Sequence, residues 1–164
     1  MIVYHGSNQD IAEIDLMKGS RFKDFGQGFY VTPDIETAKR MAWKKVDLFK
    51  GIPTIITYEI DDSVFTTEEL KVKMFPERAT AEWLLFVDRN RNRRHVSEPH
   101  DYDIVIGPIA DDGVALQLGR LRAHADNADV IATDLQDKYL DQQVYFGTPQ
   151  SLKYLKKTSV CHLK

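Results

Sequence analysis

With 164 residues, 43% of them hydrophobic and 29% charged, the chain is long enough to bury a core as one domain, and its composition is that of a soluble globular protein. Its formal net charge of −3 argues against a general attraction to nucleic acid or to an anionic membrane. The one cysteine, Cys161, excludes a disulfide scaffold and a cysteine-based metal site, and it fits a reducing compartment.

The start of the chain and its apolar runs bear on location. Met1 opens directly into a strand-like run, with no signal peptide or transit sequence. No apolar run approaches the length that a membrane-spanning helix needs. We therefore expect a cytoplasmic protein of one domain, covering residues 1–164, with no metal and no membrane partner.

The first part of the chain predicts strand, loop, strand, helix and strand. Ile2–Tyr4 is a short apolar strand that a polar turn at residues 5–7 ends. Asp24–Thr32 carries two glycines into an aromatic strand, and Ile35–Trp43 follows as a helix after a Pro-Asp stop. Ile52–Ile60 is rich in β-branched residues and gives the strongest strand signal in the chain.

The second part mixes helices with strands. Ala79–Asn90 predicts a helix, because its apolar residues recur on one face. The other expected elements are a turn or short helix at Thr66–Met74, a strand at Asp101–Ile109, a helix at Gly113–Ala125, a helical turn at Asp134–Leu140, a strand at Gln142–Thr148 and a terminal helix at Pro149–Lys157. Strands scattered among helices without a βαβ rhythm favour an α+β fold with a mostly antiparallel or split sheet.

The stretch Asp24–Thr32, DFGQGFYVT, has two interpretations. Glycine permits close backbone approaches that a Cβ would block, so a Gly-x-Gly run feeding an aromatic strand suggests one wall of a pocket. The same pattern also fits a glycine-bulged hairpin in which Tyr30 is a half-buried strand residue.

Three polar or aromatic residues stand at strand ends and could meet in one cleft: His5, Tyr30 and Gln143. This requires that the first strand, the strand after the glycine stretch and the last predicted strand lie together. Taken singly, none of them indicates a site: a lone histidine after a strand is usually a surface or capping residue, a lone glutamine at a strand start is usually just polar, and Tyr30 also fits a half-buried strand residue.

The basic run Arg89–His95 also has two interpretations. Cations are favourable at a helix C-terminus because they complement the helix dipole. The same run could instead be an edge that contacts a substrate or a nucleic acid.

The order of several segments resembles the ADP-ribosyltransferase superfamily, in its branch with the His-Tyr-Glu pattern, which includes diphtheria toxin and the poly(ADP-ribose) polymerases. The chain is more similar to a family of small bacterial proteins of that superfamily, of unknown function and encoded near apparent antitoxin genes. The segments that carry the resemblance are Tyr4–Ser7, Asp24–Thr32, Trp83–Arg91, Tyr102–Asp112 and Gln143–Thr148.

The resemblance implies an ADP-ribosyltransferase-like fold of split, mostly antiparallel sheets with flanking helices. It implies a NAD-dependent mono-ADP-ribosyltransferase, of the glycosyltransferase class, acting as the toxin of a bacterial toxin–antitoxin pair. Such an enzyme splits the nicotinamide–ribose bond through an oxocarbenium-like transition state. The expected partners are NAD as substrate, an antitoxin protein, and a protein or nucleic-acid acceptor.

The resemblance also assigns roles to residues. The backbone of Gly6 would hold the nicotinamide carboxamide, Tyr30 would stack on its ring, and His5 would bond the adenosine-side ribose. Arg21 or Lys23 would meet the pyrophosphate, which attracts cations. The implied catalytic set is His5, Tyr30 and Gln143, and the implied NAD-binding set is His5, Gly6, Ser7, Arg21, Gly28, Phe29 and Tyr30.

The sequence departs from the pattern at the third motif position, where Gln143 stands in place of glutamate. An amide can hydrogen-bond but carries no charge and cannot act as a base. Elongation of a poly(ADP-ribose) chain is therefore not expected, whereas transfer of a single ADP-ribose, hydrolysis of NAD or binding of NAD remain open. Asp111 or Asp112 could serve as a base. The alternatives are a catalytically weak NAD or ADP-ribose binding module, and an RNA 2′-phosphotransferase-like enzyme whose basic run holds RNA.

Overall fold

The computed structural model describes residues 1–94 and 98–164, and its strands form two sheets. A three-stranded antiparallel sheet has the order β1-β3-β7, and a four-stranded sheet has the order β2-β6-β5-β4, in which only the β4–β5 pair is parallel. The strands are β1 (Ile2–Ser7), β2 (Phe29–Val31), β3 (Thr54–Ile60), β4 (Val72–Met74), β5 (Ile104–Pro108), β6 (Gln142–Phe146) and β7 (Leu155–His162).

The helices begin at residues whose side chains accept hydrogen bonds from the first backbone N–H groups, the usual N-cap chemistry. The cap of the first helix is Asp34, and the cap of the third is Asp111. The α-helices are α1 (Ile35–Phe49), α2 (Ala81–Arg91), α3 (Asp112–Arg122), α4 (Ala128–Leu135) and α5 (Pro149–Leu152), and a 3₁₀ turn spans Asp62–Phe65. Within the described residues, no helix combines the length and the apolar character needed to cross a membrane.

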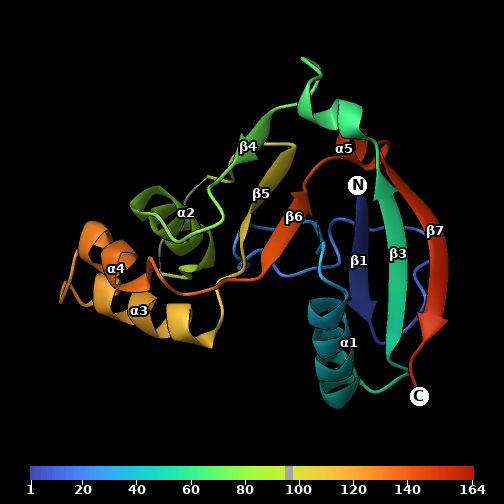
Figure 1. Cartoon of the computed structure of the whole chain (residues 1–164), viewed down its shortest axis with the longest axis horizontal. Coiled ribbons are helices and arrows are strands. Elements are labelled where there is room, and N and C mark those ends of the chain that lie inside the picture. The colour runs from blue at the N-terminus through green and yellow to red at the C-terminus, as the bar shows by residue number, and fades with distance from the viewer. Residues whose placement is uncertain (95–97) are drawn as a thin grey trace.

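The elements are distributed unevenly through the molecule. Figure 1 shows the three-stranded sheet and both termini at one side, helices α2, α3 and α4 gathered at the other, and β4, β5 and β6 between them. Helix α1 packs along β1. This arrangement confirms the expected α+β fold with split, mostly antiparallel sheets.

The two sheets share one apolar core on one face of β6. Val144 and Phe146 of β6 belong to a buried cluster that also contains Val3 of β1 and Ile56 of β3. Tyr145 points to the opposite face and joins a second cluster, formed with helices α2, α3 and α4. Because side chains alternate along a strand, Gln143 lies on the same face as Tyr145 and away from the core shared by the sheets.

One backbone bridge connects the two sheets between β1 and the end of β2. The amide of Tyr4 donates to the carbonyl of Thr32 at 2.8 Å, and the amide of Thr32 donates back to the carbonyl of Tyr4 at 2.9 Å. Beyond this pair β1 has no partner strand on that edge within the described residues. The split therefore opens directly beside residues 5 and 6.

Three predicted elements in the second part of the chain differ from the structure. The terminal helix predicted at Pro149–Lys157 stops at Leu152, and Leu155–His162 is an edge strand paired with β3. Spacing of Leu152 and Leu155 suggested a helix, but the β-branched residues that follow favour a strand. Of the helical turn predicted at Asp134–Leu140, only the first two residues are helical, as the end of α4. The turn or short helix predicted at Thr66–Met74 is a turn at Thr66 followed by strand β4.

The close packing of α1 on β1 depends on Gly6. A Cβ built at Gly6 would lie 2.7 Å from the backbone nitrogen of Ala42, and the carbonyl oxygen of Ala38 is nearer still. Ala38 and Ala42 are themselves fully buried. The neighbours are backbone atoms of a helix, so they cannot swing aside to admit a methyl group.

We predict that Gly6→Ala lowers the free energy of unfolding by at least about 1–3 kcal/mol, the usual cost of overpacking. Gly119→Ala is the matched control, because a Cβ there meets nothing within 4 Å and the residue lies inside helix α3. That control should raise stability by about 0.5–1 kcal/mol. Urea denaturation followed by circular dichroism measures both, and equal stability of Gly6→Ala and wild type would contradict the described packing.

Candidate functional site

A cleft of about 370 Å³ opens where the two sheets separate, and it brings together residues far apart in sequence. Its walls come from β1, the end of β2, helix α1, the start of β6, the loop before β2 and the segment after β5. The three residues singled out at strand ends, His5, Tyr30 and Gln143, all line this cleft. Their predicted convergence is therefore present in the structure.

His5 is fixed by hydrogen bonds to both of its ring nitrogens. Its Nδ1 lies 2.6 Å from the carbonyl oxygen of Tyr30, and its Nε2 lies 3.0 Å from Nζ of Lys45. A carbonyl can only accept, so Nδ1 carries the proton and Nε2 accepts from the lysine. The ring of Phe29 stacks on the imidazole at a centroid separation of 4.4 Å. Burial of the imidazole, reinforced by the Lys45 charge, lowers the pKa of His5 to about 3, so the ring is neutral at physiological pH.

Two lysines bring positive charge to the cleft. Burial, together with the charges of Lys23 and Lys18, lowers the pKa of Lys45 to about 8. Burial also lowers the pKa of Lys23, while the Asp24 carboxylate opposes that shift. The pKa of Lys45 is lowered by neighbouring cations and raised by no anion among the described residues, so this part of the cleft favours an anionic ligand.

Tyr30 presents an aromatic ring whose hydroxyl group is already committed. The hydroxyl donates to the carbonyl of Gly26 at 2.6 Å and accepts from the amide of Phe25 at 3.1 Å. Burial, and then the Asp24 charge, raise the pKa of Tyr30 well above its usual value. The ammonium group of Lys23 lies over the ring, 5.1 Å from its centroid. The tyrosine therefore serves as a cation-attracting platform and not as an acid or base.

Gln143 is buried, and both hydrogens of its amide are in use. Nε2 donates to Oδ2 of Asp24 at 2.9 Å and to the carbonyl of Pro108 at 3.1 Å. Both partners can only accept, so the orientation of the amide is determined. The carbonyl oxygen Oε1 is left as the side chain's one uncommitted polar atom among its described contacts, available to a donor in the cleft.

Asp24 places a largely buried carboxyl group beside Gln143. Its side chain is only 13% exposed, and Oδ2 accepts from the amide of Ala110 at 2.8 Å as well as from Gln143. Oδ1 lies 3.4 Å from Nη1 of Arg91. Burial raises the pKa of Asp24, although these hydrogen bonds and the Arg91 charge work against the shift. The loop before β2 thus places a negative charge next to Gln143.

The edge of β1 offers backbone groups to the cleft at Gly6. Tyr4 directs its N–H and carbonyl toward β2, and these groups alternate sides along an antiparallel strand. Gly6, two residues on, therefore directs its own N–H and carbonyl to the same side, where the two sheets have already parted. An amide ligand could both donate to and accept from this edge.

Four of the residues assigned to NAD binding by resemblance do not line the cleft. Ser7 accepts a hydrogen bond from Gln9 at 3.3 Å, and Phe29 packs behind His5. The Arg21 guanidinium lies over Phe22, 5.4 Å from the ring centroid. Gly28 faces the ring of Tyr145 and the backbone of β6, where a Cβ would have no room.

The two aspartates considered as bases have different positions. Asp111 caps helix α3 by accepting from the amide of Val114 at 2.9 Å, and it also pairs with Lys138 at 2.9 Å. Asp112 is exposed and lines the cleft. Within the described residues, no group of three or more His, Cys, Asp or Glu side chains could hold a metal ion.

Sequence reasoning missed Asp24 and Lys45. Lys45 had a signal, because it follows Ala38 and Ala42 at helical spacing and so shares the face of α1 that packs on β1. Asp24 opens the glycine stretch, but its partner Gln143 is 119 residues away. No local pattern relates two such residues.

Comparison with known proteins gives one finding on family. The family model described as "Protein of unknown function (DUF3990)" matches residues 1–157. No curated protein and no solved structure gives a significant match. Because the matched region covers nearly the whole sequence, the chain belongs to the DUF3990 family.

Proposed function

We propose that this protein is a NAD-dependent mono-ADP-ribosyltransferase. The observation that carries the proposal is the joint presence, in one cleft, of a neutral His5, the ring of Tyr30 and the Asp24–Gln143 pair. A dinucleotide needs an aromatic surface, hydrogen-bonding groups for two riboses and cations for a pyrophosphate, and this cleft offers each of them.

The cleft suggests a place for each part of NAD. The nicotinamide ring is a pyridinium cation, and the Tyr30 ring already holds the ammonium of Lys23 on its face. A pyridinium could replace that ammonium, because both are attracted by the ring quadrupole. Lys23 would then be free to join Lys45 at the pyrophosphate. The open backbone edge at Gly6 suits the nicotinamide carboxamide, which has one acceptor and one donor group.

The reaction follows from this placement. The bond between the ribose C1′ and the nicotinamide nitrogen breaks, and nicotinamide leaves as a neutral molecule with the bonding electrons. The acceptor's nucleophilic atom forms a new bond to C1′, and its proton passes to water or to Asp112 at the cleft. Positive charge develops on the ribose as the bond breaks. The Asp24 carboxylate and the Gln143 carbonyl oxygen would stabilise that charge and hold a ribose hydroxyl.

Asp24 offers an answer to the missing glutamate. A glutamate on β6 would combine an acceptor and a negative charge in one side chain. In this chain the acceptor is Oε1 of Gln143, while the charge lies 2.9 Å from its amide nitrogen, on Asp24. Polarisation of the amide by the carboxylate makes Oε1 a stronger acceptor.

The toxin role, the antitoxin partner and the location have support outside the cleft. The five segments shared with small bacterial proteins encoded near antitoxin genes support a toxin role and an antitoxin partner. The exposed, unpaired Cys161 fits a reducing compartment, and we propose the cytoplasm as the site of action.

A second candidate is a NAD or ADP-ribose binding module without turnover. It is favoured by the amide at position 143 and by the commitment of both its hydrogens to protein groups. The two candidates separate in one experiment. Purified protein, free of antitoxin, is incubated with NAD labelled in the adenosine moiety and with cell lysate. Release of nicotinamide above background supports the enzyme, and its absence leaves only the binding module.

The first functional prediction concerns the aromatic platform. Tyr30→Ala should weaken NAD binding by roughly 1–3 kcal/mol, by analogy with bases that stack on aromatic side chains. Tyr30→Phe should keep most of the affinity, because it keeps the ring. Isothermal titration calorimetry with NAD measures both. Tyr139→Ala is the matched control, since Tyr139 is 81% exposed and does not line the cleft; equal affinities of Tyr30→Ala and this control would reduce Tyr30 to a packing residue.

The second functional prediction tests the Asp24–Gln143 pair. Gln143→Ala should lower turnover by about a hundredfold or more while changing NAD affinity far less, because the bond to Oε1 strengthens as the oxocarbenium forms. Gln143→Glu alone should also lose turnover, since its carboxylate would face that of Asp24.

Adding Asp24→Asn to Gln143→Glu should recover much of that turnover, because the charge and the amide have exchanged places. Nicotinamide release under saturating NAD is the measurement, with thermal denaturation to confirm folding of each variant. Turnover that is no higher in the double variant than in Gln143→Glu would contradict the shared role of the pair.

The third functional prediction is a pH dependence. Lys45 must be protonated to bind a pyrophosphate, and its pKa is lowered to about 8. The cation is therefore present below pH 8 and lost above it, so NAD affinity should fall by up to about tenfold between pH 8 and pH 9. Lys45→Arg keeps its charge through this range and should bind with a nearly constant affinity. An identical decline in the two proteins would show that Lys45 does not meet the ligand.

A further inference from the structure

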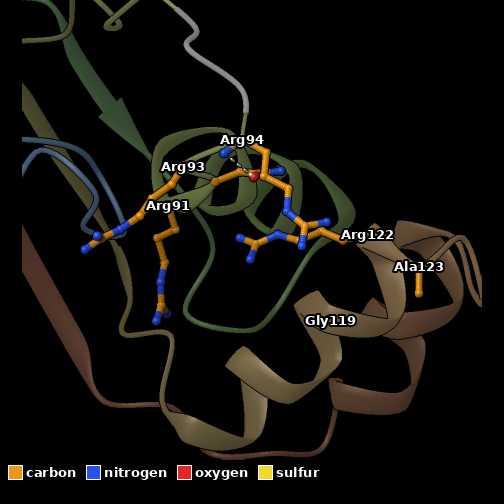
Figure 2. Close-up of a pocket in the computed structure, with 7 residues that line it drawn as sticks. Arg91, Arg93, Arg94, Gly119, Arg122 and Ala123 are labelled. Carbon is orange, nitrogen blue, oxygen red and sulfur yellow. Dashed lines mark hydrogen bonds between the residues drawn. The ribbon is translucent and has the colours of Figure 1, made fainter.

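A second cavity, of about 540 Å³, lies where the C-terminal ends of α2 and α3 approach each other. We call it the arginine pocket, and Figure 2 shows the residues that line it. Those residues are Arg91, Asn92, Arg93, Arg94, Gly119, Arg122 and Ala123. Four arginines and, among the described residues, no acidic residue line the cavity, although the whole chain has a formal net charge of −3.

The four arginines are not all neutralised by neighbouring acids. Nε of Arg122 donates to Asp88 at 2.6 Å, and Arg91 approaches Asp24. Arg93 and Arg94 have no ion pair with the described residues. Cations crowded without matching anions attract a ligand that brings negative charge.

The backbone that carries these arginines is held in place. Asn92 caps the end of α2, is buried, and accepts with Oδ1 from the amide of Arg94 at 3.0 Å, as the dashed line in Figure 2 marks. Its own amide bonds the carbonyl of Asp88 at 2.9 Å. The two uncompensated arginines therefore extend from an ordered helix end.

The arginine pocket lies next to the cleft. Arg91 lines both cavities. Phe22, which lines the cleft, has the guanidinium of Arg93 over its ring at 5.0 Å from the centroid and that of Arg21 at 5.4 Å. An aromatic ring flanked by two guanidinium groups thus stands between the arginine pocket and the cleft.

This combination fits one class of ligand better than others. Guanidinium groups recognise phosphate with paired hydrogen bonds. Aromatic rings near cations stack with unpaired bases, and the pairing of a positive groove with such rings is typical of single-strand binding. A duplex would have to unpair and unstack a base before that base could enter the cleft, whereas a single strand avoids this cost. An acidic peptide would use the charges but not the ring.

We propose that the arginine pocket holds the phosphate backbone of a single-stranded nucleic acid, and that the adjoining nucleotide enters the cleft as the acceptor of ADP-ribose. The acceptor part rests on the proposed function. A nitrogen or oxygen of the nucleotide forms the new bond to the ribose C1′, nicotinamide leaves with the electrons of the broken bond, and the nucleotide's proton passes to water.

The binding part is tested without NAD. Fluorescence anisotropy is measured with a labelled 12-nucleotide RNA, the DNA of the same sequence, the corresponding duplex and an oligoglutamate peptide. Wild type should bind a single strand at least tenfold more tightly than the duplex or the peptide, and the RNA and DNA arms identify the source of the strand. Equal or tighter binding of the duplex or the peptide overturns the proposal.

The pocket variant is Arg93→Gln/Arg94→Gln, and the control is Lys153→Gln/Lys156→Gln. Both remove two positive charges from exposed residues, and the control residues belong to the α5–β7 region, away from α2 and α3. The pocket variant should lose affinity about tenfold or more, and its slope of log K against log salt should shrink by about 1.4, or about 0.7 for each lost phosphate contact. Equal losses in the two variants would mean that only overall charge matters.

The acceptor part is tested with labelled NAD and lysate. The proposal is supported if wild type labels nucleic acid, if the pocket variant labels it less, and if the variant still releases nicotinamide by hydrolysing NAD. Label on protein alone overturns it and leaves the transferase function standing. Single-strand binding without any nicotinamide release instead keeps the pocket as a nucleic-acid site and removes the transferase function.

Discussion

The backbone bridge between Tyr4 and Thr32 is the constraint on which the site depends. Two hydrogen bonds, of 2.8 and 2.9 Å, join the two sheets at one residue pair, after which the strands part. If β1 and β2 had continued to pair beyond this bridge, the N–H and carbonyl of Gly6 would have formed hydrogen bonds with β2. Because it stops there, the backbone edge at Gly6 faces the cleft beside His5 and Tyr30. Helix α1 then closes that side, and it can do so only because residue 6 lacks a side chain.

The cleft brings together ionisable groups whose charged forms are energetically unfavourable in the folded chain, because the groups are buried. Burial alters the pKa values of His5, Lys45 and Asp24, and each shift reflects a charge that folding has made harder to keep. A chain selected for stability alone could fill such a place with apolar side chains, which are often neutral or stabilising substitutes for buried charges. Clustering of these groups in one cleft is what favours a functional site over a structural one.

The sequence allowed prediction of those features that depend on neighbours along the chain. The starts of α1, α2, α3 and α5, the β-branched strand at residues 54–60 and the strand ends at His5, Tyr30 and Gln143 follow from local patterns, whereas the start of α4 was missed. The terminal strand after Leu152 was missed because the spacing of two leucines fits a helix, whereas pairing with β3 decides the structure. Asp24 was missed for a similar reason. Its role comes from Gln143, Ala110 and Arg91, which the fold brings to it from 67 to 119 residues away.

Arg91 connects the two cavities energetically as well as spatially. Its Nη1 lies 3.4 Å from Oδ1 of Asp24, and Arg91 is also one of the residues that line the arginine pocket. A phosphate bound in that pocket would compete with Asp24 for the same guanidinium. Asp24 would then lose part of the charge that opposes the rise of its pKa, and its hold on the Gln143 amide would change. Thermodynamic linkage between the two sites is reciprocal. A ligand in the cleft that favours the ionised form of Asp24 would therefore also change the affinity of the arginine pocket for phosphate. If both cavities bind ligands, occupancy of one would thus affect the other through the Arg91 side chain.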